Sequence, residues 1–491
     1  MARSKQAVII GGGFAGLSAA CYMARAGYRV VLLEKNKKIG GRAQAAQDAG
    51  FKFDLGPNWY IMPDLYEDFF QDFGTSPEDH YKLIRLSPAF RTFTPEGEYF
   101  DALEPEHMAD QLDSFNHGDG IGFKRLLNRS KVVYSRFKLG LMQEDWLSKL
   151  SKLKPKVSST IFKLPKGTIA SRNAEFIKSR DGKAMADSFS HFLGGTANRT
   201  PAAYSFLPYT VFDQGVWYPE GGFSSVVSGF RSLAQKLGVE IYEGYEVEKV
   251  EVQYGVASAV VIKDLGERIP ADVVISASDY LNSESMLEPI YQSYSLDFWK
   301  SKQYSPSAIV VSLGLNQKVP NLLHHNTFTN PSSSDLNIRA WPSQIGTFSV
   351  TCPTFTEPNL APNGGEVLTV TIPIPAGLSD EEAAIKRLIS QAYEKISVAT
   401  GVNIQGAIVT EHIISSSYFK SMFYAPGGSI AGLAQYKDQI FQKRPRLKSK
   451  KLSNLFYAGQ DTNPGSSVGF AIVSGKLAAY AALGKRPEAK L

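Results

Sequence analysis

The first 26 residues contain the feature that most constrains this fold, a glycine-rich turn between a strand and a helix. An apolar run at residues 7–10 leads into Gly11, Gly13 and Gly16, and residues 14–26 have the pattern of a helix. Gly11 permits a tight turn, Gly13 lets the backbone approach a pyrophosphate, and Gly16 lets the helix pack closely on the strand. The helix directs its N-terminal N–H groups at the phosphates. The segment therefore predicts a Rossmann-like α/β domain that binds a dinucleotide.

The second strand of this unit ends at an acidic residue, and a second glycine pair follows. The carboxylate of Glu34 can hold ribose hydroxyl groups and would repel a 2′-phosphate. Lys35 comes next, and the chain then reaches Gly41 and Arg42, at a spacing typical of glutathione-reductase-like and amine-oxidase-like flavoproteins. In those proteins the glycines pass beside the diphosphate, and the arginine places a fixed positive charge near it. NAD-dependent dehydrogenases lack this extension, so the sequence predicts FAD.

The C-terminal region supplies a third cofactor-binding segment. A short apolar strand leads into Gly459 and Asp461, and a helix is expected over about residues 468–483. The Asp461 carboxylate is expected to bind a ribityl hydroxyl group. The helix that begins at Val468 directs its positive end at the flavin edge where negative charge accumulates on reduction. The segment therefore predicts a flavin that cycles between oxidised and reduced forms.

Two further positions complete the predicted contacts with FAD. Gly56 and Pro57 are expected to form a tight turn beside the isoalloxazine ring, and the backbone of Val247 is expected to meet the adenine. The full set of predicted cofactor-binding residues is Gly11, Gly13, Phe14, Ala15, Gly16, Glu34, Lys35, Gly41, Arg42, Gly56, Pro57, Val247, Gly459, Asp461 and Val468.

The order of strand and helix signals predicts an α/β protein whose cofactor domain is discontinuous in sequence. The apolar run at 271–277 is typical of a buried parallel strand, and strand candidates at 306–316, 345–352 and 366–373 indicate a second, mixed sheet. The predicted divisions are a glutathione-reductase-like FAD-binding domain at 1–75, 225–280 and 452–491, a substrate domain at 76–104, 185–224 and 281–451, and a basic helical membrane-associating region at 105–184.

The net charge of +6 is unevenly distributed, because residues 124–180 contain 15 Lys and Arg against 3 Asp and Glu. Basic amphipathic helices suit an anionic membrane surface, and the alternative is a solvated basic face. The apolar residues at helical spacing are Phe123, Leu126, Leu127, Val133, Phe137, Leu141, Trp146, Leu150 and Leu153. Nucleic acid is not expected as a partner, because no recognised nucleic-acid module accompanies the charge.

Two cysteines exclude a disulfide framework, and the first strand begins too early for a signal peptide. No run of 18 apolar residues predicts a membrane span, and no His, Cys and Asp set has metal-ligand spacing. We therefore expect a metal-free cytoplasmic protein, peripheral on the inner face of the cell membrane.

With these motifs in hand, the chain resembles the bacterial-type phytoene desaturase family of FAD-dependent carotenoid desaturases and isomerases over nearly its full length. The resemblance rests on the N-terminal motifs and on five further segments, namely 53–64, 217–223, 305–315, 323–326 and 442–445. It implies a membrane-associated enzyme that takes a C30 or C40 polyene from the bilayer. It also implies removal of a hydride and a proton from neighbouring carbons, with FAD as acceptor and a quinone as a candidate reoxidant.

One departure from the family pattern keeps other functions open. The family usually follows its last Pro-Gly pair with x-Gly-Val-Pro, whereas Pro464 and Gly465 are followed here by Ser466, Ser467 and Val468. A carotenoid isomerase or a terminal-methyl oxidase on the same scaffold is therefore a second hypothesis. A non-catalytic lipid-binding protein, like the Rab escort proteins, is disfavoured because the dinucleotide-binding residues are all present. An amine oxidase is a further alternative.

Two residues are candidates for a catalytic base. His324 lies at a predicted strand end, where a structural hydrogen bond is the favoured interpretation. Glu220 either faces the flavin cleft or caps a helix that begins near residue 224. The sequence does not decide between these roles.

Overall fold

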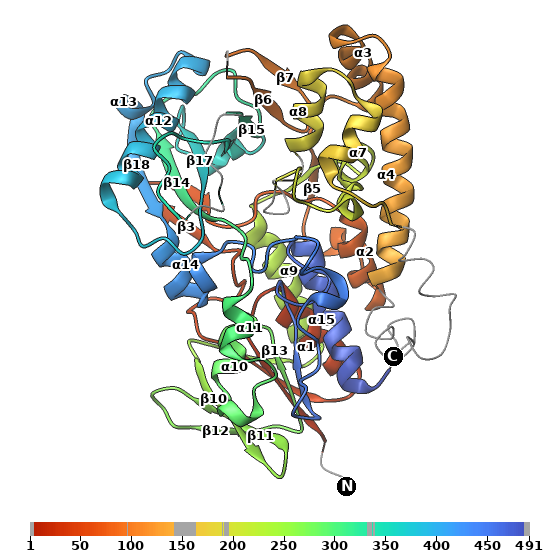
Figure 1. Cartoon of the computed structure of the whole chain (residues 1–491). Coiled ribbons are helices and arrows are strands. Elements are labelled where there is room, and N and C mark those ends of the chain that lie inside the picture. Colours follow the sequence, from red (N-terminus) through yellow and green to blue (C-terminus); the bar gives the residue numbers. More distant parts are fainter. Residues whose placement is uncertain are drawn as a thin grey trace.

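The computed structural model describes residues 4–485 except 96, 142–163, 189, 191–195, 331–335 and 337–338. Two sheets carry the architecture (Figure 1), one below the centre of the view and the other at its upper left. A group of helices lies at the upper right.

The first sheet is five-stranded and parallel, in the order β19-β13-β1-β2-β9. Its strands come from all three segments predicted to bind FAD. They are β1 (Gln6–Ile10), β2 (Arg29–Glu34), β9 (Glu240–Glu243), β13 (Val273–Ser276) and β19 (Leu455–Tyr457).

Both faces of this sheet are covered, which explains the unbroken apolar runs in its strands. Ala7 and Ile9 pack in one core cluster with helices α1 (Phe14–Arg25), α9 (Phe223–Lys236) and α15 (Val468–Leu483). The alternate residues Val8 and Ile10 pack in another cluster, against the antiparallel sheet of β10 (Val247–Gln253), β11 (Val256–Ile262) and β12 (Arg268–Pro270). Successive side chains of a strand point to opposite faces, so each strand contributes to both layers.

The second sheet is seven-stranded and mixed, in the order β18-β14-β17-β16-β15-β6-β7. Its β15–β6 pair is parallel, and its other pairs are antiparallel. The strands are β6 (Arg91–Phe93), β7 (Tyr99–Asp101), β14 (Ser307–Leu315), β15 (His325–Phe328), β16 (Phe348–Thr351), β17 (Glu366–Ile374) and β18 (Ile408–Ile414). One face packs against helix α12 (Glu382–Thr400), and helix α14 (Ser416–Phe423) contacts β14.

The helical region contains α3 (Pro105–Phe115), α4 (Asp119–Leu141), α7 (Ile169–Phe176) and α8 (Arg180–Ser188). The apolar face predicted to meet a membrane is not available there, because Phe123, Leu126, Leu127, Val133 and Phe137 are buried in the protein core. The apolar residues at helical spacing in α4 therefore pack against the rest of the protein. The side chains of Leu141, Trp146, Leu150 and Leu153 lie outside the described part of the chain. Within the described ranges, every helix is too short or too polar to cross a lipid bilayer.

Shorter elements connect these layers. Helix α2 (Pro63–Asp72) packs on α15, and the two-stranded sheet β3–β4 precedes the turn that leads to it. The other α-helices and strands in the described part of the chain are β3 (Ala45–Asp48), β4 (Phe51–Asp54), β5 (Leu83–Arg85), β8 (Trp217–Pro219), α10 (Tyr280–Ser285), α11 (Leu296–Lys300) and α13 (Ile404–Ala407).

Candidate functional site

A cavity of about 510 Å³ lies where the carboxyl ends of the parallel strands face the mixed sheet. We call the part lined by the glycine turns, Glu34, Val247, Asp279 and Asp461 the nucleotide half. The part lined by residues of β14–β17, helix α14 and the segment 55–62, with Phe90 and Ser188, is the sheet half. The crevice at strand carboxyl ends is the usual ligand site of an open α/β sheet.

The structure brings almost all of the predicted cofactor-binding residues to this cavity. Those that line it are Gly11, Gly13, Phe14, Ala15, Glu34, Lys35, Gly41, Arg42, Gly56, Pro57, Val247, Gly459, Asp461 and Val468. Gly16 does not line it. A Cβ atom there would lie 1.9 Å from the Gly11 carbonyl oxygen, so Gly16 serves the packing of helix on strand.

The Glu34 carboxylate is held by the backbone at the end of β2. Its two oxygens accept hydrogen bonds of 2.8 Å from the N–H groups of Gly12 and Asn36. Burial raises the pKa of Glu34 above its usual value, and these two hydrogen bonds oppose the rise. The neighbouring Lys35 ammonium donates to the Ser421 carbonyl oxygen at 2.7 Å and lies 3.7 Å from the centre of the Tyr424 ring. The carboxylate is thus fixed in place and keeps lone pairs for further donors.

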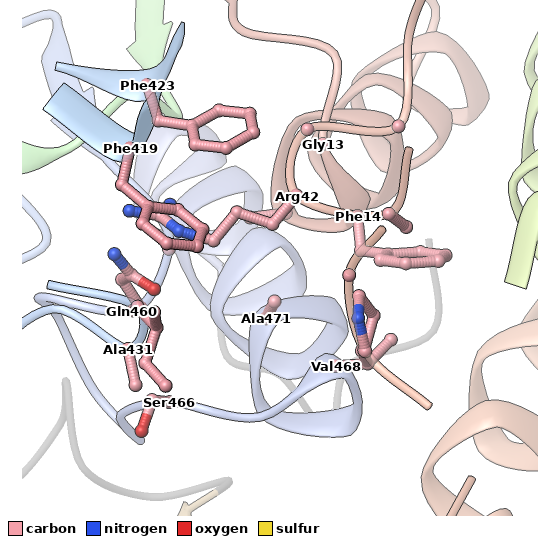
Figure 2. A pocket seen from close by; sticks show the side chains of 18 of the residues that line it. Gly13, Phe14, Arg42, Phe419, Phe423, Ala431, Gln460, Ser466, Val468 and Ala471 are labelled. Carbon is pink, nitrogen blue, oxygen red and sulfur yellow. The ribbon is translucent and has the colours of Figure 1, made fainter. Parts of the chain in front are cut away.

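The middle of the nucleotide half combines two glycines with an arginine. A Cβ atom on Gly13 would lie 3.7 Å from the Gly41 Cα atom, so the two turns face each other across a narrow gap. Arg42 forms a two-pronged ion pair with Asp279, at 3.2 and 3.0 Å, and its Nε atom is buried without a partner among the described residues. Figure 2 shows its side chain extending toward Phe419 and Phe423, and the guanidinium carbon lies 5.1 Å from the centre of the Phe423 ring.

The third segment places a carboxylate beside the start of α15. The Asp461 oxygens accept hydrogen bonds from the N–H groups of Leu433 at 2.9 Å and Tyr280 at 3.1 Å. Burial and the nearby Asp279 carboxylate raise the pKa of Asp461 to about 6. Ser467 caps the helix by accepting from the Phe470 N–H group. The helix begins at Val468, which lines the cavity, so its free N–H groups point toward the site.

These residues fit a dinucleotide flavin. The facing glycines leave space that a Cβ atom would fill, which allows a diphosphate to approach the backbone. The unpartnered Nε atom of Arg42 supplies a donor, and the Glu34 carboxylate supplies an acceptor for hydroxyl groups. In this arrangement Glu34, Gly13, Arg42 and Asp461 would hold the cofactor along its length.

Neither candidate base lies in the cavity. Glu220 is about half exposed and pairs with Lys82 at 3.5 Å. It does not cap α9 either, because the Phe223 N–H group donates to Asp54 at 3.0 Å and the Gly221 N–H group donates to Glu357 at 2.8 Å. Burial raises the pKa of Asp54 to about 7, and the Glu357 carboxylate adds to this effect.

His324 is buried outside the cavity, at the start of β15. Its Nδ1 atom shares a hydrogen bond of 2.7 Å with the Thr356 hydroxyl group. Burial lowers the pKa of His324 to about 3, so the ring is neutral at physiological pH. The neighbouring His325 stacks on Trp59, with ring centres 3.9 Å apart. The histidine pair is therefore part of the packing around the sheet half, which agrees with the favoured structural interpretation.

Sequence reasoning missed several residues that line the cavity. Asp279 follows the carboxyl end of β13, a position where ligand-binding residues of parallel sheets gather, so strand order could have identified it. Phe419 and Phe423 lie one helical turn apart in α14, a spacing equally typical of core residues. The hydroxyl residues Thr327, Ser349 and Thr371 carry no signal that separates them from other strand residues.

Comparisons with known proteins show the family to which this chain belongs. The sequence model of the family described as flavin containing amine oxidoreductase matches residues 14–483. The carotenoid 3,4-desaturase of Haloarcula japonica is 33% identical over 486 residues, covering 96% of this chain and 97% of the relative. The 4,4′-diapolycopene oxygenase of a Methylomonas species is 29% identical, covering 96% and 97% of the two chains. A phytoene desaturase of Fusarium fujikuroi is 28% identical, covering 97% and 88%.

Solved structures show the same fold at lower sequence identity. An oxidoreductase from Methanosarcina mazei has a TM-score of 0.63 at 18% identity, covering 96% of this chain and 98% of that one. A putrescine oxidase bound to putrescine has a TM-score of 0.63 at 15% identity, covering 98% and 100%. The arrangement of a parallel sheet beside a mixed sheet is thus shared with these two solved structures.

Proposed function

Because the chain belongs to the carotenoid desaturase family of flavin-containing amine oxidoreductases, we propose that it desaturates an acyclic carotenoid polyene with FAD as cofactor. When bound, the flavin supplies a two-electron acceptor. The relatives act, by their names, on carotenoids, on diapolycopene or on phytoene. The proposal therefore covers a C30 or C40 polyene whose conjugation is extended.

The sheet half of the cavity is the observation that carries this proposal. The charged residues that line the cavity, which are Glu34, Lys35, Arg42, Glu246, Asp279 and Asp461, all belong to the nucleotide half. Among the described residues assigned to the sheet half, none is charged, and aromatic and aliphatic side chains such as Trp59 and Phe90 predominate. The Arg42 guanidinium borders this half at Phe423 and is already paired with Asp279. A hydrocarbon needs no charged partner, because its binding rests on apolar contact. A protonated amine would leave its charge unpaired there.

The chain's own residues position the substrate in this scheme. Val468, Gly469 and Ala471 at the start of α15 line the same cavity as the sheet half. A polyene lying along the sheet would thus place one carbon next to the ring system of the cofactor. Holding that carbon in contact distance supplies much of the rate enhancement.

The test is to express the chain in separate cell lines that accumulate phytoene, diapophytoene or lycopene. We expect a more conjugated, red-shifted polyene in at least one line, measured by chromatography with absorption spectra. Cells that lack the gene are the control. Unchanged polyenes in all three lines, with a flavin-loaded protein present, would contradict the proposal.

Terminal-methyl oxidation is the second candidate, because the Methylomonas relative is named an oxygenase at 29% identity. Oxidation adds oxygen to the polyene, desaturation removes two hydrogens, and isomerisation leaves the mass unchanged. Mass spectrometry of the extracted pigments therefore separates these three outcomes in the same experiment.

FAD, rather than a shorter flavin, is proposed from the length of the nucleotide half. The cavity extends past the glycine turns to Glu34 and Val247. A flavin mononucleotide has no adenosine to fill the space beside these two residues. Phosphodiesterase treatment of the flavin released from the protein should yield flavin mononucleotide and AMP. Release of free flavin mononucleotide without this treatment would contradict the choice of FAD.

We also propose that the protein docks on the inner face of the cell membrane and that a membrane quinone reoxidises the cofactor. The outer face of α4 supports docking, because Ile121, Val132 and Leu139 are 59%, 41% and 57% exposed. Arg125 and Arg129 are exposed on the same helix. Exposed apolar residues beside cations suit an anionic lipid surface.

Vesicle flotation tests docking. The double variant I121S/L139S should float less with anionic vesicles than the unchanged protein, while V398S, which changes an exposed valine of α12, should float normally. Equal flotation of all three proteins would contradict this surface. Quinone reduction coupled to polyene conversion without oxygen would test the acceptor, and a requirement for oxygen would contradict it.

A further inference from the structure

One wall of the sheet half is a row of hydroxyl side chains on neighbouring strands. Thr327 of β15 lies opposite Ser349 of β16, and Ser349 lies opposite Thr371 of β17. Residues directly opposite each other in a sheet project from the same face, so the three side chains form one row. All three line the cavity. We call them the hydroxyl row.

The next residue along each strand shows which way the row faces. Phe328 and Phe348 stack with ring centres 4.9 Å apart, and Phe93 of β6 stacks on Phe328 at 4.5 Å. These three rings lie in the core cluster that includes α12. Side chains alternate between the two faces of a strand, so the hydroxyl row projects from the face opposite to the aromatic core cluster, toward the cavity, which Phe348 also borders.

The hydroxyl row has no partner in the described part of the protein. Its three side chains are partly exposed to the cavity, and none of their hydroxyl groups forms a hydrogen bond with another described residue. Thr92 of β6 extends the row beyond Thr327, and it is buried to 1% exposure with its hydroxyl group also unpartnered. By contrast, Thr351 in the next row accepts a hydrogen bond of 2.6 Å from the Asn58 side chain.

A pure hydrocarbon does not account for this wall. Apolar contact would remove water from the row and leave its hydroxyl groups unpaired, which is unfavourable in a buried site. Valine would fit a strand as well as threonine does and would suit a hydrocarbon better. An oxygen atom on the ligand would satisfy the row, because each hydroxyl group can donate or accept a hydrogen bond.

We propose that the polyene taken by this chain carries a hydroxyl or carbonyl oxygen, and that Thr327, Ser349 and Thr371 bind this oxygen. The inference rests on the proposed function and narrows its substrate class. The oxygen-bearing part lies along the mixed sheet, and the apolar remainder of the chain contacts residues such as Trp59 and Phe419. The hydroxyl row thereby acts in specificity and not in the chemical step.

The test compares two probes, lycopene and a monohydroxylated lycopene, supplied in detergent micelles to the flavin-loaded protein. We expect kcat/KM to be higher for the hydroxylated probe by roughly tenfold, the effect of about one well-placed hydrogen bond in a buried site. In the triple variant T327V/S349A/T371V the ratio of kcat/KM for the hydroxylated probe to kcat/KM for lycopene should fall to about one. Flavin absorbance reports that each variant is folded.

Ser312→Ala is the matched control. Ser312 lies on β14 of the same sheet, and its buried hydroxyl group is also unpartnered among the described residues, but it does not line the cavity. S312A should keep the preference unchanged. Equal reaction of both probes, or a preference that survives in the triple variant, would overturn the inference. If neither probe reacts, nor any polyene of the cell-based test, the proposed function itself fails.

Discussion

The two halves of the cavity are built in different ways. The nucleotide half is formed by backbone at strand ends, and its few charged side chains are held by hydrogen bonds from N–H groups, as in Glu34 and Asp461. The sheet half is formed by uncharged side chains of strands that lie far apart in the sequence. The glycine turns of the nucleotide half are therefore sensitive to added volume. The sheet half depends on the volume of the cavity that its side chains enclose.

We expect the greatest loss of stability and of flavin from added volume at Gly16, where helix α1 packs on strand β1. A Cβ atom on Gly16 would lie 1.9 Å from the Gly11 carbonyl oxygen, so G16V must displace either the helix or the strand. We expect a destabilisation of about 3 kcal/mol or more and a protein without flavin. Thermal unfolding and the ratio of flavin to protein absorbance measure both effects.

Gly13→Ala separates packing from cofactor binding in the same turn. A Cβ atom on Gly13 meets only ordinary contacts, the nearest at 3.7 Å. G13A should therefore keep its melting temperature and lose flavin affinity, because the added methyl group fills the gap between the glycine turns. A G16V protein that binds flavin normally would contradict the packing role assigned to Gly16.

The next effect comes from filling the sheet half. Val310 of β14 lines the cavity beside Thr371, its partner in the sheet. V310F should lower polyene turnover by roughly 100-fold, because even a small displacement of a bound substrate carries a cost of this size. Flavin content should stay normal, since the nucleotide half is untouched.

Val409→Phe is the matched control for this variant. Val409 lies on β18 of the same sheet and is 52% exposed to solvent, so a larger ring meets no wall of the cavity. V409F should keep both turnover and flavin content. Normal turnover in V310F would show that the polyene does not occupy the sheet half.

The same contrast explains what the sequence could predict. The glycine motifs, Glu34 and Asp461 are local signals whose spacing carries the geometry of the turn, and the structure places all of these predicted residues except Gly16 at the cavity. The row of Thr327, Ser349 and Thr371 depends on the register of three strands, which no local pattern encodes. In helix α4 the amphipathic spacing indicates that one face is covered, but it does not say whether protein or lipid covers it. The structure places the protein core against that face.

A pH effect is expected at Asp54, just before the turn that joins the two halves. Its pKa is raised to about 7 by burial, above the usual value of 3.8, so the folded protein binds a proton more tightly than the unfolded chain does. The stability of the folded state should therefore increase as the pH falls through 7. The expected gain from this group is about 1 kcal/mol between pH 8 and pH 6.

Asp54→Asn tests this effect, because the amide keeps an acceptor for the Phe223 N–H group and cannot ionise. Urea unfolding across this pH range should show a smaller increase in D54N. Glu220→Gln removes an exposed carboxylate near the same helix and should keep the wild-type profile. An identical profile in D54N would show that Asp54 is ionised throughout.

The smallest effect is expected at His324, which sequence analysis had kept as a candidate base. Its ring lies outside the cavity, is neutral because burial lowers its pKa to about 3, and shares a hydrogen bond with Thr356. In H324Q the amide can keep that bond, so polyene turnover should change by no more than a few-fold. A general base contributes roughly 10² to 10⁴ to the rate, so steady-state kinetics at normal flavin content distinguish the two roles. A loss in that range in H324Q would restore His324 to the reaction and move the chemistry away from the sheet half.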